Sequence, residues 1–298
     1  MGTPDFARKP LERLYDDGHD ITAVFTQPDR PNTRGMKVRF SPVKELAASH
    51  DTPVFQPVSL KDGTAEKALR ELSPDLIAVV AYGKLLPPDI LGIPPKGCIN
   101  IHASLLPELR GAAPIQWAVL NGAKETGVTS MFMAEELDAG DILLARKTSV
   151  DEQETAGELQ NRLSMLGAEL LSETIVHIDN GTAIRKPQNH ADATFAPPLS
   201  KSLSPIDWSM GARHIMCRVR GLNPWPIATA EFGGTLLKVF SVEISVSDPG
   251  KRPGEIVDIG RQGLKVACAD GIVTITELQA PGGKRMAASD YLRGNPVI

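Results

Sequence analysis

The chain has 298 residues, of which 42% are hydrophobic and 23% charged, and its formal net charge is −4. This length predicts about two domains, and the composition excludes a disordered or collagen-like chain. No run approaches the roughly 20 apolar residues of a membrane span, and the first residues lack the features of a secretory signal. Three scattered cysteines fit neither a disulfide framework nor a zinc site. We therefore expect a cytoplasmic protein with no bound metal.

The charges are unevenly distributed along the chain. From Ser200 onward there are 12 Lys and Arg residues against 9 Asp and Glu, whereas the preceding part is acidic. Within that acidic part, residues 30–44 contain basic side chains and no acidic one: Arg30, Arg34, Lys37, Arg39 and Lys44. A solvated loop and a contact for a polyanion both fit this pattern.

Up to about residue 180, strand-like and helix-like segments alternate. This alternation predicts an α/β fold of Rossmann-like type, with a mainly parallel sheet and helices on both faces. We expect strands at 21–25, 54–55, 76–81, 98–102, 128–133 and 142–150. Helices are expected from Ser41-Pro42 and over 65–72 and 114–120.

The clearest helix begins at Thr155. Thr155 and Glu158 have the spacing of a capping box. One apolar stripe follows, formed by Leu159, Leu163, Leu166 and Leu170. Asn180-Gly181 provides a left-handed stop, so the helix should end there.

The alternation of strand-like and helix-like segments ends over residues 182–206. Four prolines interrupt this polar stretch, which we interpret as a linker. It would separate a first domain, 1–181, from a second, 207–298. After a helix at 210–220 we expect five short strands, at 228–232, 236–244, 255–259, 264–269 and 272–278. This spacing favours a C-terminal OB-like β-barrel domain, with another small β domain as the alternative.

The densest polar motif lies at the end of the expected strand 98–102. Asn100 and His102 are two residues apart, so their side chains share one face of the strand. The loop containing Asp138 could orient the imidazole and favour its charged form. An amide donor, a group that exchanges protons near neutral pH and a carboxylate together suit direct acyl transfer between two nitrogens.

Several segments, in this order, resemble those of folate-dependent formyltransferases. The most specific is Asn-Ile-His-Ala-Ser-Leu-Leu-Pro at 100–107, and Leu-Asp-Ala-Gly-Asp at 137–141 matches the family's Asp loop. Further resemblances lie at 2–7, 27–44, 110–116 and 218–226. The resemblance therefore covers essentially the whole chain.

The resemblance implies transfer of a formyl group from 10-formyltetrahydrofolate, as co-substrate, to the α-amino group of methionyl-initiator tRNA. It implies catalytic roles for Asn100, His102 and Asp138. Folate-binding positions are implied at Tyr82, Gly83, Leu85, Leu86, Ser104, Leu105, Leu106, Pro107, Ala139 and Gly140. tRNA-binding positions are implied at Arg30, Arg34, Lys37 and Arg39, supported by the C-terminal domain, in a monomeric protein.

Two alternatives keep part of this interpretation. Another enzyme of the superfamily would formylate an amino sugar or a glycinamide nucleotide, or hydrolyse the folate, without needing the basic loop. A noncatalytic tRNA-binding protein is the second alternative. The family also has a buried strand ahead of its Gly-Thr-Pro-Asp-Phe loop, whereas here only Met1 precedes Gly2. We therefore expect an unfilled position in the central sheet.

Overall fold

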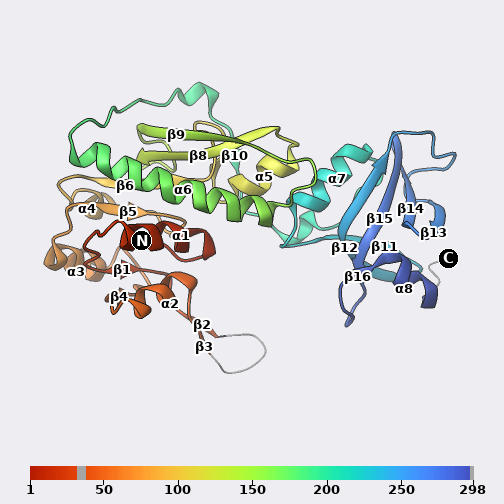
Figure 1. The fold of residues 1–298 in the computed structure, drawn as a ribbon, viewed down its shortest axis with the longest axis horizontal. Coiled ribbons are helices and arrows are strands. Elements are labelled where there is room, and N and C mark those ends of the chain that lie inside the picture. Colours follow the sequence, from red (N-terminus) through yellow and green to blue (C-terminus); the bar gives the residue numbers. More distant parts are fainter. Residues whose placement is uncertain (32–37, 296–298) are drawn as a thin grey trace. The chain divides into compact units, whose positions relative to one another are not determined.

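The computed structural model describes residues 1–31 and 38–295, which divide into two units (Figure 1). Unit 1 contains residues 1–114, 125–149 and 160–196. Unit 2 contains 115–124, 150–159 and 197–298. No helix within the described ranges is long and apolar enough to cross a membrane.

The central sheet of unit 1 has four strands in the order β5-β6-β8-β9. They are β5 (Ile77–Val79), β6 (Cys98–His102), β8 (Glu125–Phe132) and β9 (Ile142–Ser149). β5 and β6 are parallel, whereas β8 and β9 add an antiparallel edge. A separate parallel pair is formed by β1 (Val24–Phe25) and β4 (Val54–Phe55). The α/β class is confirmed, and the predicted strands agree in place with these elements.

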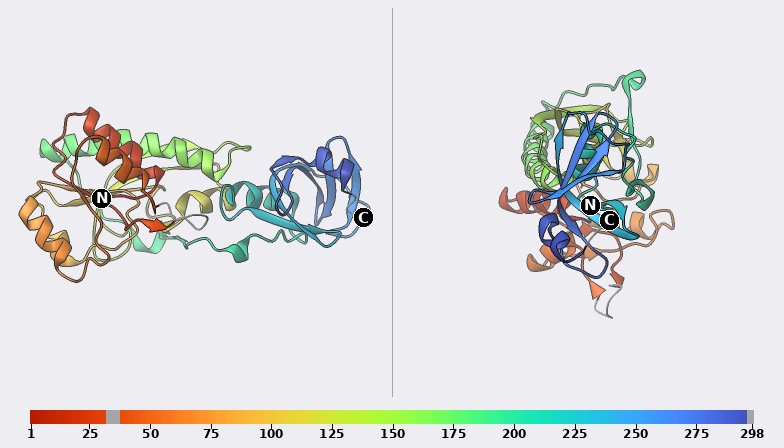
Figure 2. Two further views of the ribbon diagram at one scale, coloured as in Figure 1. Left: turned by 90° about the horizontal axis from the view of Figure 1, so that it is seen from below. Right: turned by 90° about the vertical axis from the view of Figure 1, so that its right-hand side faces the viewer.

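Helices cover both faces of this sheet. α6 (Ala156–Asp179) lies beside α1 (Asp5–Asp16) on one face, and α3 (Thr64–Leu72) lies on the other (Figure 2). At Gly167 of α6 a Cβ would lie 3.1 Å from Ile101 of β6, so the helix packs closely on the strand. α2 (Pro42–Ser49), α4 (Pro88–Leu91) and α5 (Pro114–Leu120) complete the helices of this part of the chain.

The predicted caps explain where two of these helices begin. Ser41 accepts a hydrogen bond from the Lys44 N–H at the start of α2. At α6 the capping box is reciprocal, because Thr155 N–H donates to Glu158 and Glu158 N–H donates to Thr155 Oγ1. Gly181, at φ +66°, follows the last turn of α6 as expected.

A groove separates β1 from β5. Met1 and Gly2 bridge these strands at one end, where Gly2 N–H donates to Phe25 O and Val80 N–H donates to Met1 O. Beyond them lies a cavity of about 430 Å³, lined by segments 19–25 and 72–78 among others. The cavity lies between these two strands, and the expected unfilled sheet position stays a prediction. The Met1 amino group is buried there although the residue is partly exposed, and burial lowers its pKa to about 5.

Unit 2 contains the predicted C-terminal β domain as one antiparallel sheet, ordered β11-β12-β15-β14-β13. Its strands are β11 (Ala228–Phe232), β12 (Thr235–Ser245), β13 (Ile256–Gly260), β14 (Gly263–Cys268) and β15 (Gly271–Gln279), with β16 (Met286–Ala287) on β15. Among the described strands β11 and β13 do not pair, so the sheet is not closed into a barrel. Instead, Ser204 and Ile206 form backbone hydrogen bonds with Thr229 of β11.

The core of the C-terminal domain lies between this sheet and α7 (Ala212–Gly221). Ile215 and Val219 of α7 are fully buried in a cluster with residues of β11, β12, β14 and β15, and the partly buried Ile256 of β13 packs against it. A short helix, α8 (Ala288–Gly294), closes the described chain. In the stretch predicted as a linker, residues 182–196 belong to unit 1 and the chain enters unit 2 at residue 197.

Candidate active site

β6 places Asn100 and His102 on one face of the central sheet. The strand lies between β5 and β8, and Asn100 is in register with Val79 and Met131. Ile99 and Ile101 occupy the opposite face and are buried. His102 is 6% exposed and Asn100 is half-buried, so the pair lies at the edge of the core.

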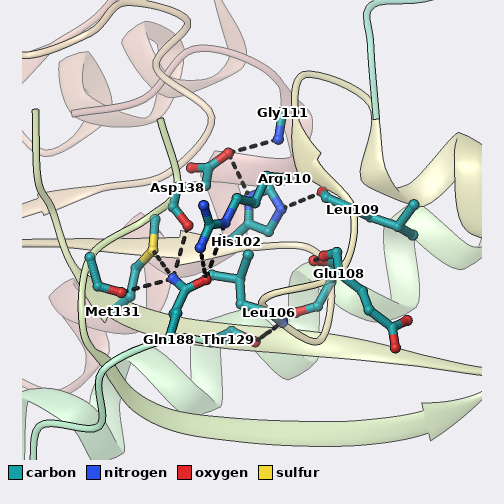
Figure 3. A network of polar contacts seen from close by, with 12 residues as sticks. His102, Leu106, Glu108, Leu109, Arg110, Gly111, Thr129, Met131, Asp138 and Gln188 are labelled. Atoms are coloured by element: carbon teal, nitrogen blue, oxygen red, sulfur yellow. Dashed lines mark hydrogen bonds and ion pairs between the residues drawn. The ribbon is translucent and has the colours of Figure 1, made fainter. Parts of the chain in front are cut away.

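Both ring nitrogens of His102 have partners (Figure 3). Nε2 donates to the carbonyl oxygen of Leu109 at 2.9 Å, and Nδ1 lies 3.6 Å from Oδ2 of Asp138. The carbonyl favours a proton on Nε2, and the carboxylate favours a proton on Nδ1. The ring is therefore held in one orientation between a backbone carbonyl and an acidic side chain.

Asp138 reaches His102 from the connection between β8 and β9. Its side chain is 10% exposed, and Gly111 N–H donates to its Oδ2 at 2.8 Å. Asp138 has φ +51°, in the left-handed region that non-glycine residues adopt rarely. Two residues later, a Cβ at Gly140 would lie only 1.8 Å from the carbonyl oxygen of Phe132. The loop therefore requires glycine there, beside the backbone of β8.

Hydrogen bonds of the Ser104 and Thr129 side chains hold the turn after β6. Ser104 Oγ donates to Glu108 O at 2.6 Å, and Thr129 Oγ1 donates to Ser104 O at 2.7 Å. Leu106 N–H in turn donates to Thr129 Oγ1. The side chains of Ser104 and Leu106 are buried, whereas Leu105 and Pro107 are partly exposed.

The turn after β5 combines buried and exposed side chains. Tyr82 and Leu86 are buried in the core, and burial raises the pKa of Tyr82 to about 12. The Tyr82 carbonyl accepts a hydrogen bond from Gln27 Nε2 at 3.0 Å. Gly83, at φ +79°, turns the chain, and Leu85 is 60% exposed. Leu85 is thus the apolar side chain of this turn that is available to a ligand.

The basic loop begins and ends in a short antiparallel pair. Arg30 in β2 (Arg30–Pro31) is in register with Arg39 in β3 (Val38–Arg39). Arg34 and Lys37, two of the predicted tRNA-binding residues, lie outside the described residues. At the base of the loop, Lys44 pairs with Asp29 and donates to Gln56 Oε1 at 2.7 Å.

Two buried residues beside the site were not predicted. Arg110 is 1% exposed and Gln188 is 7% exposed, and they are hydrogen-bonded to each other. Arg110 lies within a segment that resembles the family, but no role was expected for it. Gln188 lies in the stretch interpreted as a linker, where no local pattern indicates a buried glutamine. Elsewhere in the described ranges, no group of three or more His, Cys, Asp or Glu could hold a metal ion.

Two family models match the chain in sequence order. A model described as "Formyl transferase" matches residues 1–175, and "Formyl transferase, C-terminal domain" matches residues 198–296. The chain belongs to the formyl transferase family. Two curated relatives are both named methionyl-tRNA formyltransferase. The one from Alkaliphilus oremlandii is 47% identical, with the match covering 100% of this chain and 96% of the relative. The one from Pelotomaculum thermopropionicum is 48% identical, with 100% and 95% coverage.

Solved structures share the fold of this formyl transferase. An N-formyltransferase from Helicobacter canadensis, in complex with folinic acid and dTDP-3-aminofucose, gives a TM-score of 0.66 at 16% identity. That match covers 92% of this chain and 97% of the other. HypX from Aquifex aeolicus, in complex with tetrahydrofolic acid, gives a TM-score of 0.62 at 19% identity, with 92% and 47% coverage.

Proposed function

We propose that this formyl transferase moves a formyl group from 10-formyltetrahydrofolate to the α-amino group of methionyl-initiator tRNA. The observation that carries the proposal is the full-length match to relatives named methionyl-tRNA formyltransferase, which spans both family domains. The site geometry supports the same chemistry, because the buried contact between His102 and Asp138 lies beside Asn100, which is on the same strand as His102.

The chemistry requires one proton to leave the attacking amine and one to reach the departing folate nitrogen. In this step the single proton of the neutral ring lies on Nδ1, toward Asp138, and the unprotonated Nε2 turns from the Leu109 carbonyl to the substrate, accepts the proton of the amine and passes it to the departing nitrogen. Asp138 stabilises the charged ring that forms. Asn100 donates a hydrogen bond to the formyl oxygen, on which negative charge develops, and Nε2 of His102 donates to it once it has accepted the proton. No covalent enzyme intermediate is needed.

The folate would lie against three turns that surround this pair. Exposed apolar side chains suited to an aromatic ring are present in two of them, Leu85 after β5 and Leu137 in the Asp138 loop. The buried Tyr82, Leu86, Ser104 and Leu106 would shape these turns and contribute backbone groups. Ala139 and Gly140 would line the site from the Asp138 loop, and Leu105 and Pro107 from the third turn, which follows β6 beside His102.

The basic loop would contact tRNA phosphates. Arg30, Arg34, Lys37 and Arg39 carry four positive charges with no intervening acid. Replacing Arg34 and Lys37 with Ala should raise the KM for tRNA and reduce its salt dependence by about one unit of slope per lost phosphate contact. The KM for folate should barely change, and a Lys67→Ala/Arg70→Ala control on the exposed face of α3 should leave both unchanged. Impaired folate use with an unchanged tRNA KM and salt slope would assign the loop to the folate instead.

The proposed reaction is tested by offering several acceptors to the same enzyme. With 10-formyltetrahydrofolate as donor, we expect rapid formylation of methionyl-initiator tRNA and at most slow formylation of free methionine. An amino-sugar nucleotide should not compete, and hydrolysis of the donor without acceptor should be slow. Preferential sugar formylation or acceptor-independent hydrolysis would overturn the proposal in favour of another activity of the family. Binding of tRNA with no transfer would indicate a noncatalytic protein.

A further inference from the structure

Gln188 joins the two segments that hold the His102–Asp138 pair (Figure 3). It lies beyond α6, where the chain returns along β9, and the neighbouring Lys186 forms a backbone bridge with Ile142. Although this segment runs along the edge of unit 1, Gln188 is only 7% exposed. A buried glutamine side chain requires hydrogen-bond partners for both ends of its amide.

One end of the amide holds the Asp138 loop. Nε2 donates to the carbonyl oxygen of Asp138 at 2.9 Å and to that of Gly140 at 2.8 Å. These two carbonyls lie on either side of Ala139. A single donor group therefore fixes the backbone of the tight turn whose first residue, Asp138, has a left-handed conformation.

The other end of the amide holds Arg110. Oε1 accepts from Arg110 Nη2 at 2.7 Å and from Nε at 3.2 Å. The guanidinium group can only donate, so the oxygen of Gln188 must face Arg110 and the nitrogen must face the two carbonyls. Arg110 also contacts His190 Nδ1 at 3.4 Å and Glu136 at 3.6 Å. The buried guanidinium thereby has three polar partners, and Glu136 is the one among them that carries a negative charge.

The neighbours of Arg110 are the backbone groups that orient the catalytic pair. Leu109 provides the carbonyl that accepts from His102, and Gly111 provides the N–H that donates to Asp138. The Gln188 amide consequently connects the backbone of Asp138 to the segment that fixes both His102 and the Asp138 carboxylate. We infer that Gln188 is a positioning residue, which sets the separation of Asp138 and His102 through its bonds to Arg110 and to the Asp138 loop.

The inference rests on the proposed function and is tested with two substitutions that divide the roles of the amide. Gln188→Glu retains an acceptor for Arg110 but places a carboxylate against the carbonyls of Asp138 and Gly140. Gln188→Leu removes both connections. Since misplacement of a catalytic group by about 1 Å can cost about 100-fold, we expect kcat of each variant to fall about 10- to 100-fold. The KM for the formyl donor should change less than threefold.

A matched control separates positioning from loss of stability. Thr174 in α6 is fully buried, and its hydroxyl contacts Leu170 O and Ser130 Oγ, which is in register with Ile101 on the face of the sheet opposite His102. Thr174→Val should lower the melting temperature while preserving kcat. Should Gln188→Leu not fold, Gln188→Glu decides alone, because it keeps the partner of the buried Arg110.

A readout independent of turnover is hydrogen exchange at the amide of Gly111, which donates to the Asp138 carboxylate. We expect this amide to exchange faster in Gln188→Glu than in wild type, with no change in Thr174→Val. Wild-type kcat together with wild-type exchange at Gly111 in Gln188→Glu would overturn the inference. If wild type itself transferred no formyl group, the proposed function would fail, while exchange at Gly111 would still decide whether Gln188 positions Asp138.

Discussion

Replacing Asp138 with Asn isolates the effect of one charge on His102. Gly111 N–H donates to Oδ2 at 2.8 Å, and the same oxygen lies 3.6 Å from His102 Nδ1. Because Gly111 requires an acceptor at that position, the amide oxygen of Asn should occupy it. The variant then keeps the geometry of the site and loses the negative charge beside the imidazole.

The size of the effect follows from the separation of the two groups. At 3.6 Å and an effective dielectric constant of about 20, a charge pair interacts by about 4–5 kcal/mol. If most of this stabilises the charged His102 during proton transfer, kcat should fall about 10³-fold. The KM for the formyl donor should change little, because the shape of the loop is retained.

The assay is the rate of formyl transfer to methionyl-initiator tRNA, measured for kcat and KM across the pH range in which wild type is folded. Asp141→Asn provides a matched control on the same loop, since Asp141 pairs with Arg185 at the surface and not with His102. We expect wild-type kcat from the control and an altered pH–rate profile from Asp138→Asn. A kcat within threefold of wild type and an unchanged profile in Asp138→Asn would refute the electrostatic role. Equal losses in both variants would indicate a general disturbance of the loop.

Two further predictions concern other parts of the structure. His102→Ala should lower kcat by at least about 10²–10³-fold while leaving tRNA binding in a filter assay unchanged; near-normal turnover would remove His102 from the mechanism. Thr155→Ala should cost about 1 kcal/mol by denaturant titration. The hydrogen bond from Thr155 holds the pKa of Glu158 below its ordinary value. The stabilisation by this hydrogen bond is therefore complete above the ordinary pKa of Glu158 and should be lost as the pH falls through the lowered pKa. An equal cost of Thr155→Ala at high and at low pH would contradict the capping box.

The elements with a local signal could be predicted from the sequence. The capping box at Thr155 and the glycine at 181 mark the two ends of α6. Both are local signals, because each depends on residues three or four positions away in the sequence. β6 was predicted with its observed ends. α1 was not predicted, since Pro10 lies inside it and charged residues are interspersed along its whole length. Its buried residues nevertheless recur at helical spacing, and tertiary packing against α6 outweighs the proline.

The residues of the site also divide into those that have a local sequence signal and those that have none. Asn100 and His102 could be paired from strand periodicity alone. The loop at 137–141 was proposed from its aspartates, and the specific role of Asp138 was assigned through the resemblance. Gln188 could not be predicted, because its partners lie 50 and 78 residues away along the chain. The Leu109 carbonyl and the Gly111 N–H left no sequence signal either, since every residue offers a carbonyl and almost every residue an N–H.

This dependence on backbone groups explains the tight construction of the segment around Gly111. Phe195–Ala196 forms a parallel pair, β10, with Arg110–Gly111, β7, and the N–H of Arg110 donates to Thr194 O. At Gly111, which has φ +121°, a Cβ would lie 2.7 Å from Ala196 O. The segment around Gly111 is therefore held by the pairing of β7 with β10 on one side and by the Arg110–Gln188 contact on the other. A site oriented by backbone atoms requires such support, because the position of its N–H and carbonyl groups is set only by the surrounding structure.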